Sequence, residues 1–417
     1  MINSRRGTHR AEKKYTPSLE GIIDARKLFD SEIRKTPLTS SHTLSEKIGS
    51  HVFLKMELLQ KTGSFKVRGA WSKLNSLSAE ERRKGVITAS AGNHAQGVAF
   101  SAMKKNIPCK IIMPKSASPA KVAATRSYGA EVILSGSTYD ETWKIADSIS
   151  KDYGNVMIHA FDDPLVICGQ GTIGLELMED LQQFDKVYVP IGGGGLASGI
   201  SIALKAKRPN VKIIGVESNQ YPAMKESVMS GHIVTTPGGF SIADGISVKS
   251  PGELTFKLCS EYVDDIVTVD DISIVETMFL LMEREKVVVE PAGAASLAYL
   301  LSHHDLKRDE RAISILSGGN VDMYLLGQIV AKGLMQMGRM LRLFIQLPDK
   351  PGALKTVVDR IADLSVNIVE VNHDRLSANI AAGSAGVYLS LELEDEKHAK
   401  KLMSFLAKEG IEFRLSS

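Results

Sequence analysis

The chain alternates short apolar runs with longer segments whose apolar residues recur at helical spacing. Residues 51–59 alternate apolar and polar positions, which predicts a strand, and residues 70–77 carry the apolar stripe of a helix. Further strands are predicted at 86–90, 109–114, 130–136, 186–191, 211–217 and 312–317, and further helices at 18–34, the later part of 91–102, 121–128, 140–150, 171–181, 192–206, 277–286, 293–304 and 320–334. Because strands that alternate with helices build parallel β-α units, we expect an α/β fold with two lobes and a cleft between them.

The pattern changes after about Gly338. Strands are predicted at 341–348, 367–375, 385–394 and 411–415, interleaved with helices at 351–364 and 396–410. This β-α-β-β-α-β order is the ferredoxin-like plan, so we expect a separate C-terminal domain.

Composition narrows the class of protein. The 417 residues suffice for two to three domains, and the net charge of +3 is too small to indicate nucleic-acid or membrane binding. No apolar run reaches the roughly 18 residues of a membrane-spanning helix. The cysteines at 109, 168 and 259 show no metal-ligand spacing and suit a reducing compartment, so we expect a cytoplasmic protein. Residues 1–17 are basic and lack the apolar core of a secretory signal, so we expect a flexible tail, with a targeting segment as the alternative.

Lys66 lies in the turn KTGSFKVRGA (61–70), between a predicted strand and a predicted helix. Its glycines allow the backbone to approach a ligand closely, and a helix N-terminus lowers the cost of nearby negative charge. A lysine in such a place can form a Schiff base with an aldehyde once its amine loses a proton. Taken alone, the lysine would be an ordinary solvated loop residue.

Three further turns follow predicted strands and change that interpretation. The backbone N–H groups of GGGGL (192–196) can surround a phosphate, and the spacing differs from the G-x-G-x-x-G fingerprint of nicotinamide cofactors. SAGNHAQG (90–97) suits a small carboxylate at a helix N-terminus. SGGN (317–320) places the hydroxyl of Ser317 where it could meet a ring nitrogen. If either of the last two turns is considered on its own, an ordinary helix N-cap is the better interpretation.

Together these turns resemble the motifs of the pyridoxal-phosphate enzymes related to tryptophan synthase β-subunit, which have fold type II. Within that group the chain is similar to the threonine ammonia-lyases (threonine dehydratases) that carry one C-terminal ACT domain, and the DKPGAL turn at 349–354 resembles an ACT turn. The resemblance runs from about Ser18 to the end of the chain. It implies a catalytic region at 18–335, with a larger lobe at 18–50 and 156–335 and a smaller lobe at 51–155, followed by an ACT regulatory domain at 336–417.

The resemblance implies pyridoxal 5'-phosphate as the cofactor and assigns a role to each motif. Lys66 would be the catalytic lysine that holds the cofactor, and Ser317 would meet the ring nitrogen. A hydroxyl cannot sustain a pyridinium as a carboxylate would, which favours elimination over transamination. The implied cofactor-binding residues are Phe65, Lys66, Asn93, Gly192, Gly193, Gly194, Gly195, Leu196, Gly245 and Ser317. The implied substrate-binding residues are Ser90, Ala91, Gly92, Asn93 and His94, with Asn93 also contacting the ring hydroxyl.

The segments EPAGAA (290–295) and SIADGI (241–246) also match the family. Glu217 resembles a cation ligand of related serine racemases, but Ala223 stands where a second carboxylate would be needed. We therefore expect no divalent metal, and a monovalent cation beside Glu217 or Glu290 is left open.

The implied reaction converts L-threonine to 2-oxobutanoate and ammonia, and L-serine to pyruvate, in isoleucine biosynthesis or in threonine catabolism. Serine racemase or serine dehydratase is the alternative within the fold, and a non-catalytic amino-acid sensor is the alternative outside it. O-Acetylserine-type synthases fit less well, because their S-x-K-D-R and T-S-G-N-T runs are absent.

The ACT resemblance concerns regulation and assembly. It implies isoleucine or valine as an effector, bound near Asp349, Pro351, Gly352, Ala353 and Leu354, and a homodimer or homotetramer. A packing module without a ligand is the alternative.

Overall fold

The computed structural model describes residues 16–378 and 380–416, and the chain divides into two compact units after Asp322. Residues 1–15 of the expected flexible segment lie outside the described residues. The expected boundaries of the two lobes and of the regulatory domain stay predictions. None of the helices in the described part of the chain combines the length and the apolar character that crossing a bilayer requires.

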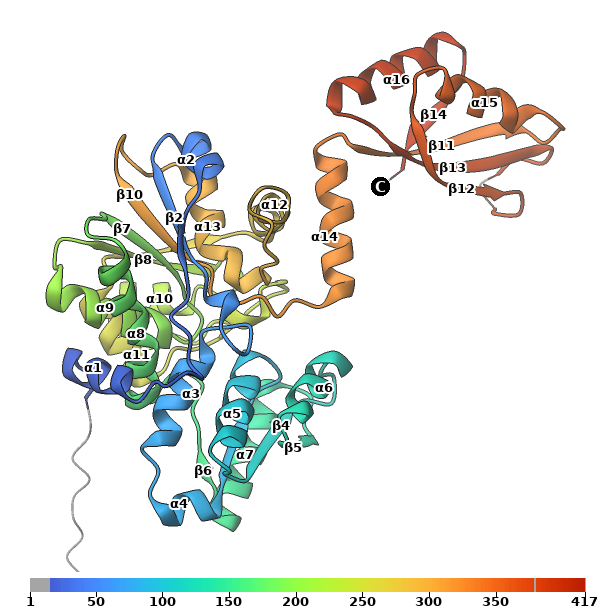
Figure 1. Cartoon of the computed structure of the whole chain (residues 1–417). Helices are drawn as coiled ribbons and strands as arrows, with labels where there is room; N and C mark the ends of the chain where they lie inside the picture. Colours follow the sequence, from blue (N-terminus) through green and yellow to red (C-terminus); the bar gives the residue numbers. More distant parts are fainter. Residues whose placement is uncertain (1–15, 379, 417) are drawn as a thin grey trace, which may run out of the picture. The chain divides into compact units, whose positions relative to one another are not determined.

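The first unit contains a six-stranded sheet in the order β1-β2-β10-β7-β8-β9, in which only the β1–β2 pair is antiparallel (Figure 1). Its strands are β1 (Leu38–Ser40), β2 (His51–Lys55), β7 (Lys186–Pro190), β8 (Lys212–Ser218), β9 (Asp265–Val269) and β10 (Arg311–Ile315). The helices that follow or flank them are α1 (Leu19–Lys27), α2 (His42–Ile48), α8 (Pro164–Asp180), α9 (Gly195–Lys207), α10 (Ala223–Ser230), α11 (Glu253–Tyr262), α12 (Asp271–Leu280) and α13 (Pro291–His303).

A second sheet of the first unit has four parallel strands in the order β5-β4-β3-β6. Its strands are β3 (Val86–Ala89), β4 (Cys109–Met113), β5 (Glu131–Leu134) and β6 (Val156–Met157), and the associated helices are α3 (Lys66–Asn75), α4 (Ala79–Lys84), α5 (Asn93–Lys104), α6 (Pro119–Ser127) and α7 (Tyr139–Tyr153). The two sheets have separate apolar cores, and they confirm the predicted parallel β-α architecture.

Several predicted elements differ in extent because local capping or packing overrides periodicity. The helix predicted at 171–181 begins at Pro164, since the Asp163 carboxylate accepts hydrogen bonds from the N–H groups of Leu165 and Val166. The strand predicted at 51–59 ends at Lys55, and a 3₁₀ turn follows at Glu57–Leu59. Sequence periodicity also missed the short elements β1, α2 and β6 and the later α10, α11 and β9.

The second unit begins with α14 (Met323–Gln336) and continues as β11 (Met340–Pro348), α15 (Ala353–Ala362), β12 (Asn367–Asp374), β13 (Ser384–Glu392), α16 (Glu396–Lys408) and β14 (Phe413–Leu415). The antiparallel sheet has the order β12-β13-β11-β14, and α15 and α16 cover one of its faces (Figure 1). This order confirms the predicted ferredoxin-like plan.

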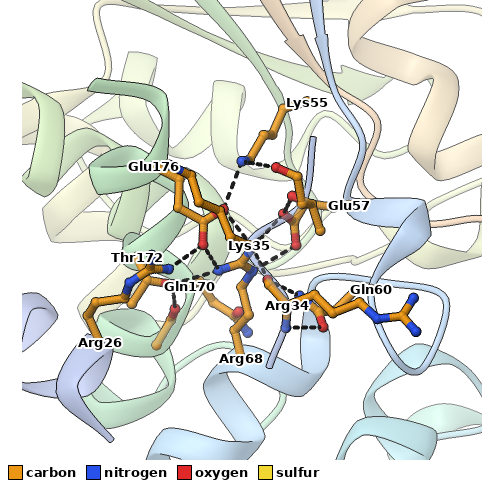
Figure 2. Close-up of polar contacts among 12 residues, drawn as sticks. Arg26, Arg34, Lys35, Lys55, Glu57, Gln60, Arg68, Gln170, Thr172 and Glu176 are labelled. Carbon is orange, nitrogen blue, oxygen red and sulfur yellow. Dashed lines mark hydrogen bonds and ion pairs between the residues drawn. The ribbon is translucent and has the colours of Figure 1, made fainter. Parts of the chain in front are cut away.

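A buried network of charges lies beneath the start of α3 (Figure 2). The Arg68 guanidinium donates to both carboxylate oxygens of Glu57, at 2.8 Å each, and to Glu176 at 2.7 and 3.0 Å. The Lys55 ammonium lies 2.7 Å from Oε2 of Glu176, an oxygen that Arg68 also contacts, and donates to the Thr36 carbonyl at 2.7 Å. The four charged side chains are fully buried. The network therefore joins α3 to β2, to the 3₁₀ turn and to α8.

Removing Glu57 would take away two of the six hydrogen bonds that the buried Arg68 guanidinium donates. We expect Glu57→Ala to lower the free energy of unfolding by about 3–5 kcal/mol, as for other broken buried pairs. Lys151→Ala, in the exposed pair with Asp147, should change it by at most about 1 kcal/mol. Urea unfolding followed by circular dichroism measures both, and equal effects would contradict a structural role for the network.

Candidate active site

All residues that the sequence assigns to the cofactor and the substrate line one cavity of about 670 Å³ in the first unit. The lysine turn, the glycine turn, the asparagine turn and the Ser317 turn all contribute to its wall. Three of these turns directly follow β3, β7 and β10, so the cavity opens at the carboxyl ends of parallel strands, where α/β proteins bind ligands.

Lys66 is the first residue of α3, and its ammonium group donates to the Ala160 carbonyl at 2.9 Å. The amine also lies 5.2 Å from the centre of the Phe65 ring. Burial lowers the pKa of Lys66 to about 8. The nearby Glu290 carboxylate acts in the other direction and raises this pKa, but burial has the larger effect. A lysine in this environment supplies neutral amine near neutral pH, which reaction with an aldehyde requires.

The glycine turn lies between β7 and α9 and supplies a close-fitting cradle. Gly194 caps α9 with a φ of +90°, a conformation that favours glycine. A Cβ atom on Gly193 would lie 2.3 Å from the Phe161 ring, so this position has no room for a side chain. The first turn of α9 has N–H groups without helical partners, and such groups bind phosphate.

The asparagine turn connects β3 to α5. The Ser90 hydroxyl accepts a hydrogen bond from the Gly92 N–H at 3.2 Å, and α5 begins at Asn93. The free N–H groups of this helix start suit a carboxylate. His94 is buried, and its Nε2 lies 3.0 Å from the Ile158 carbonyl. Burial lowers the pKa of His94 to about 3, so its imidazole is neutral.

Glu290, which the sequence placed at the cofactor face or a cation site, lines the cavity, and Asn320 extends the site beyond the assigned residues. The Asn93 amide donates to the Glu290 carboxylate at 2.6 Å, and burial raises the pKa of Glu290 to about 7. Asn320 lines the same cavity, although sequence reasoning singled out only Ser317 from its turn. Its place in the SGGN motif was the available signal. Lys121 and Asp244 also line the cavity and form an ion pair at 2.6 Å; Asp244 lies in the SIADGI segment, whereas the sequence contained no signal for Lys121.

Glu217 is not among the residues that line the cavity. Its two carboxylate oxygens accept the N–H groups of Met224 and Lys225, both at 2.8 Å, at the start of α10. Burial raises the pKa of Glu217 to about 8. Within residues 16–378 and 380–416, no three side chains of His, Cys, Asp or Glu gather as metal ligands would.

Of the expected effector residues, 349–352 form the turn between β11 and α15 in the second unit, and Ala353 and Leu354 begin α15. Gly352 caps α15 with a φ of +89°, and the Asp349 carboxylate pairs with Arg375 at 2.9 Å.

The residues present fit pyridoxal phosphate. The cradle excludes side chains at Gly193, the helix start offers N–H donors for a phosphate, and the lysine has a lowered pKa. The family model described as pyridoxal-phosphate dependent enzyme matches residues 29–318.

Two groups of relatives differ in how much of the chain they match. The L-threonine ammonia-lyase of Thermotoga maritima is 45% identical over 398 residues, which cover 95% of this chain and 99% of the relative. This match is longer than the first unit, so it extends into the second. The catabolic L-threonine dehydratase TdcB of Escherichia coli K12 is 46% identical over 314 residues, 75% of this chain and 95% of the relative.

Solved structures share the fold over about three quarters of the chain. Maize serine racemase superposes with a TM-score of 0.73 at 36% identity, covering 77% of this chain and 99% of the racemase. The processed threonine deaminase isoform 2 of Solanum lycopersicum has a TM-score of 0.72 at 36% identity, covering 76% of this chain and 90% of the deaminase.

The lowered pKa of Lys66 predicts unusual reactivity of its amine. Competitive labelling of the cofactor-free protein with trace acetic anhydride should show Lys66 becoming reactive with a midpoint near pH 8, because its neutral form appears there. Mass spectrometry measures the labelling, with the exposed Lys151 as the reference amine. A midpoint at the ordinary lysine value would contradict the proposed environment.

Proposed function

Because the chain belongs to the pyridoxal-phosphate dependent enzymes, we propose that it is a threonine ammonia-lyase, which converts L-threonine to 2-oxobutanoate and ammonia. The observation that carries this conclusion is the 45% identity to the Thermotoga maritima L-threonine ammonia-lyase over 95% of the chain. L-Serine, which lacks only the methyl group, is the expected second substrate and gives pyruvate.

Lys66 holds the cofactor and later moves a proton. Its Nζ atom is held by the Ala160 carbonyl and carries a lowered pKa, which suits it to take the proton from Cα of threonine. The cofactor, when bound, supplies the electron sink that makes this proton acidic. Ser317 would offer a neutral hydroxyl rather than a carboxylate to the cofactor ring. A hydroxyl does not hold a proton on the ring nitrogen, so the cofactor withdraws fewer electrons, which favours elimination over transamination.

The glycine turn at 192–196 holds the phosphate through backbone N–H groups. The start of α5 orients the substrate through its carboxylate, with Ser90 fixing the turn by its bond to the Gly92 N–H. The buried and neutral His94 adds no charge beside this carboxylate.

Serine racemase activity is the second candidate, favoured by the superposition with the maize enzyme. That superposition covers 77% of this chain, whereas the likeness to the threonine ammonia-lyase continues into the second unit. We therefore assign threonine deamination first and racemisation of serine as a side reaction to be measured.

The second unit is proposed to act as an ACT domain that binds isoleucine or valine at residues 349–354. Its ferredoxin-like plan and the φ of +89° at Gly352 support a turn that presents backbone groups to a small ligand. Assembly as a homodimer or homotetramer and location in the cytoplasm are proposed with it.

Lys66→Ala tests the catalytic assignment. We expect the formation of 2-oxobutanoate from threonine to fall by at least about 10³-fold, because both the attachment of the cofactor and the proton transfer are lost. Lys61→Ala in the same turn should keep its activity, since Lys61 points to Glu32 at 4.0 Å and does not line the cavity. Substantial turnover by cofactor-saturated Lys66→Ala would refute the assignment.

Gly352→Leu tests the effector site. Isoleucine should inhibit the unchanged protein, and the variant should need at least about tenfold more isoleucine for the same inhibition, as for a lost contact of about 1.4 kcal/mol. Gly410→Leu is the matched control, because Gly410 also has a positive φ and open space around it in the same unit. Identical inhibition curves for the two variants would exclude a site at this turn.

A further inference from the structure

The lysine turn and the Ser317 turn are joined by their backbones. The Phe65 N–H donates to the Ser317 carbonyl at 3.1 Å, and the Gly319 N–H donates to the Gly63 carbonyl at 2.8 Å. Asn320 extends this pairing with its side chain, whose Nδ2 donates to the Thr62 carbonyl at 2.8 Å. The two turns therefore keep a fixed distance.

The same side chain reaches a third motif. Asn320 Nδ2 donates its second hydrogen to Asn93 Oδ1 at 2.8 Å, and Asn93 Nδ2 donates to Glu290 Oε1 at 2.6 Å. These bonds form a relay that starts at a backbone carbonyl and ends at a carboxylate.

The polarity of the relay follows from the Thr62 carbonyl, which can only accept. It requires the amino group of Asn320 to face it, and this amino group in turn requires the oxygen of Asn93. The amino group of Asn93 is then on the side of Glu290, whose carboxylate accepts. Once Asn320 and Glu290 are satisfied, Asn93 keeps one N–H for a ligand.

Gly318 packs closely against this relay. A Cβ atom on Gly318 would lie 2.2 Å from Glu290 Oε1 and 3.1 Å from Asn93 Nδ2. Glu290 is only 6% exposed. Loss of the hydrogen bond from Asn93 would leave its buried carboxylate without that donor, which would be costly.

We propose that Asn320 is a positioning residue that fixes the orientation of the Asn93 amide, so that Asn93 presents an N–H and not its carbonyl to the cofactor. This inference rests on the proposed function only through the identity of the cofactor. An N–H donor stabilises the anionic form of a ring oxygen, whereas a carbonyl would repel it.

The test compares Asn320→Asp with Asn320→Ala in the full-length protein. The cofactor is removed, and pyridoxal phosphate is titrated back while its absorbance is followed. An aspartate has nearly the volume of asparagine but cannot donate when ionised, so it should reverse the Asn93 amide. We expect Asn320→Asp to bind pyridoxal phosphate at least about tenfold more weakly than the unchanged protein, the effect of one buried hydrogen bond, and more weakly than Asn320→Ala.

The pH dependence adds a second readout. The deficit of Asn320→Asp relative to the unchanged protein at the same pH should shrink as the pH falls, because a protonated carboxyl donates one hydrogen bond again. A side chain that only fills space would produce the opposite order, with alanine weaker than aspartate, and that order would overturn the proposal.

A double variant separates orientation from folding. In Asn320→Asp/Glu290→Gln, the reversed carbonyl of Asn93 meets a glutamine that can donate, so resistance to urea should recover relative to Asn320→Asp alone. The affinity for pyridoxal phosphate should stay low, because the carbonyl still faces the cofactor. Recovery of that affinity to the unchanged value would refute the donor role. If Asn320→Asp alone does not fold, the double variant is compared with Glu290→Gln.

Asn367→Asp is the matched control, because Asn367 also donates to a glutamate, Glu392, at 3.0 Å, but is exposed in the second unit. It should leave pyridoxal phosphate binding unchanged.

If the unchanged protein binds pyridoxal phosphate but does not turn over threonine, the proposed function fails and the binding order of the variants still tests the relay. If the unchanged protein binds no pyridoxal phosphate, the assignment of the cofactor fails, and only the order of the variants in resistance to urea tests the relay.

Discussion

The buried charges around Arg68 are the constraint on which the geometry of the site depends. Two cations, Lys55 and Arg68, meet two anions, Glu57 and Glu176, and all four side chains are fully buried (Figure 2). Desolvation offsets much of the attraction in such clusters, so their net contribution to stability is small. Their geometry is nevertheless specific, because the planar guanidinium meets Glu57 through two parallel hydrogen bonds. What the network contributes is therefore the position of α3, which begins at Lys66, two residues before Arg68.

Burial and mutual attraction act in opposite directions on the charges of Lys66 and Glu290. Burial favours the neutral form of both groups, which lowers the pKa of Lys66 to about 8 and raises that of Glu290 to about 7. Each group in its charged form favours the charged form of the other. The Asn93 amide donates to the Glu290 carboxylate and so favours the ionised form of that group. The amine is thus held at a pKa where it can both carry and release a proton near neutral pH.

The chemistry of the turns could be predicted because it is local in sequence. The Lys66 motif and the glycine run each lie within about ten residues, and the structure brings both to one cavity. Their supporting partners could not be predicted, because Arg68 meets Glu176 at a separation of 108 residues and Asn320 meets Asn93 at 227. The start of α8 was missed for a different reason: the local cap formed by Asp163 outweighs the apolar period that suggested residue 171.

Glu217 shows how a carboxylate can support the site from outside the cavity. Both of its oxygens accept N–H groups from the first turn of α10, and these bonds favour the ionised form against the burial that raises the pKa of Glu217. Met224, whose N–H is one of these donors, packs behind the glycine turn: a Cβ atom on Gly194 would lie 2.5 Å from its terminal methyl. A cation bound to Glu217 would have to compete with these two N–H groups, which are already in place. The carboxylate therefore positions α10 and, through Met224, the back of the glycine turn, just as the Arg68 network positions the lysine on the other side of the cavity.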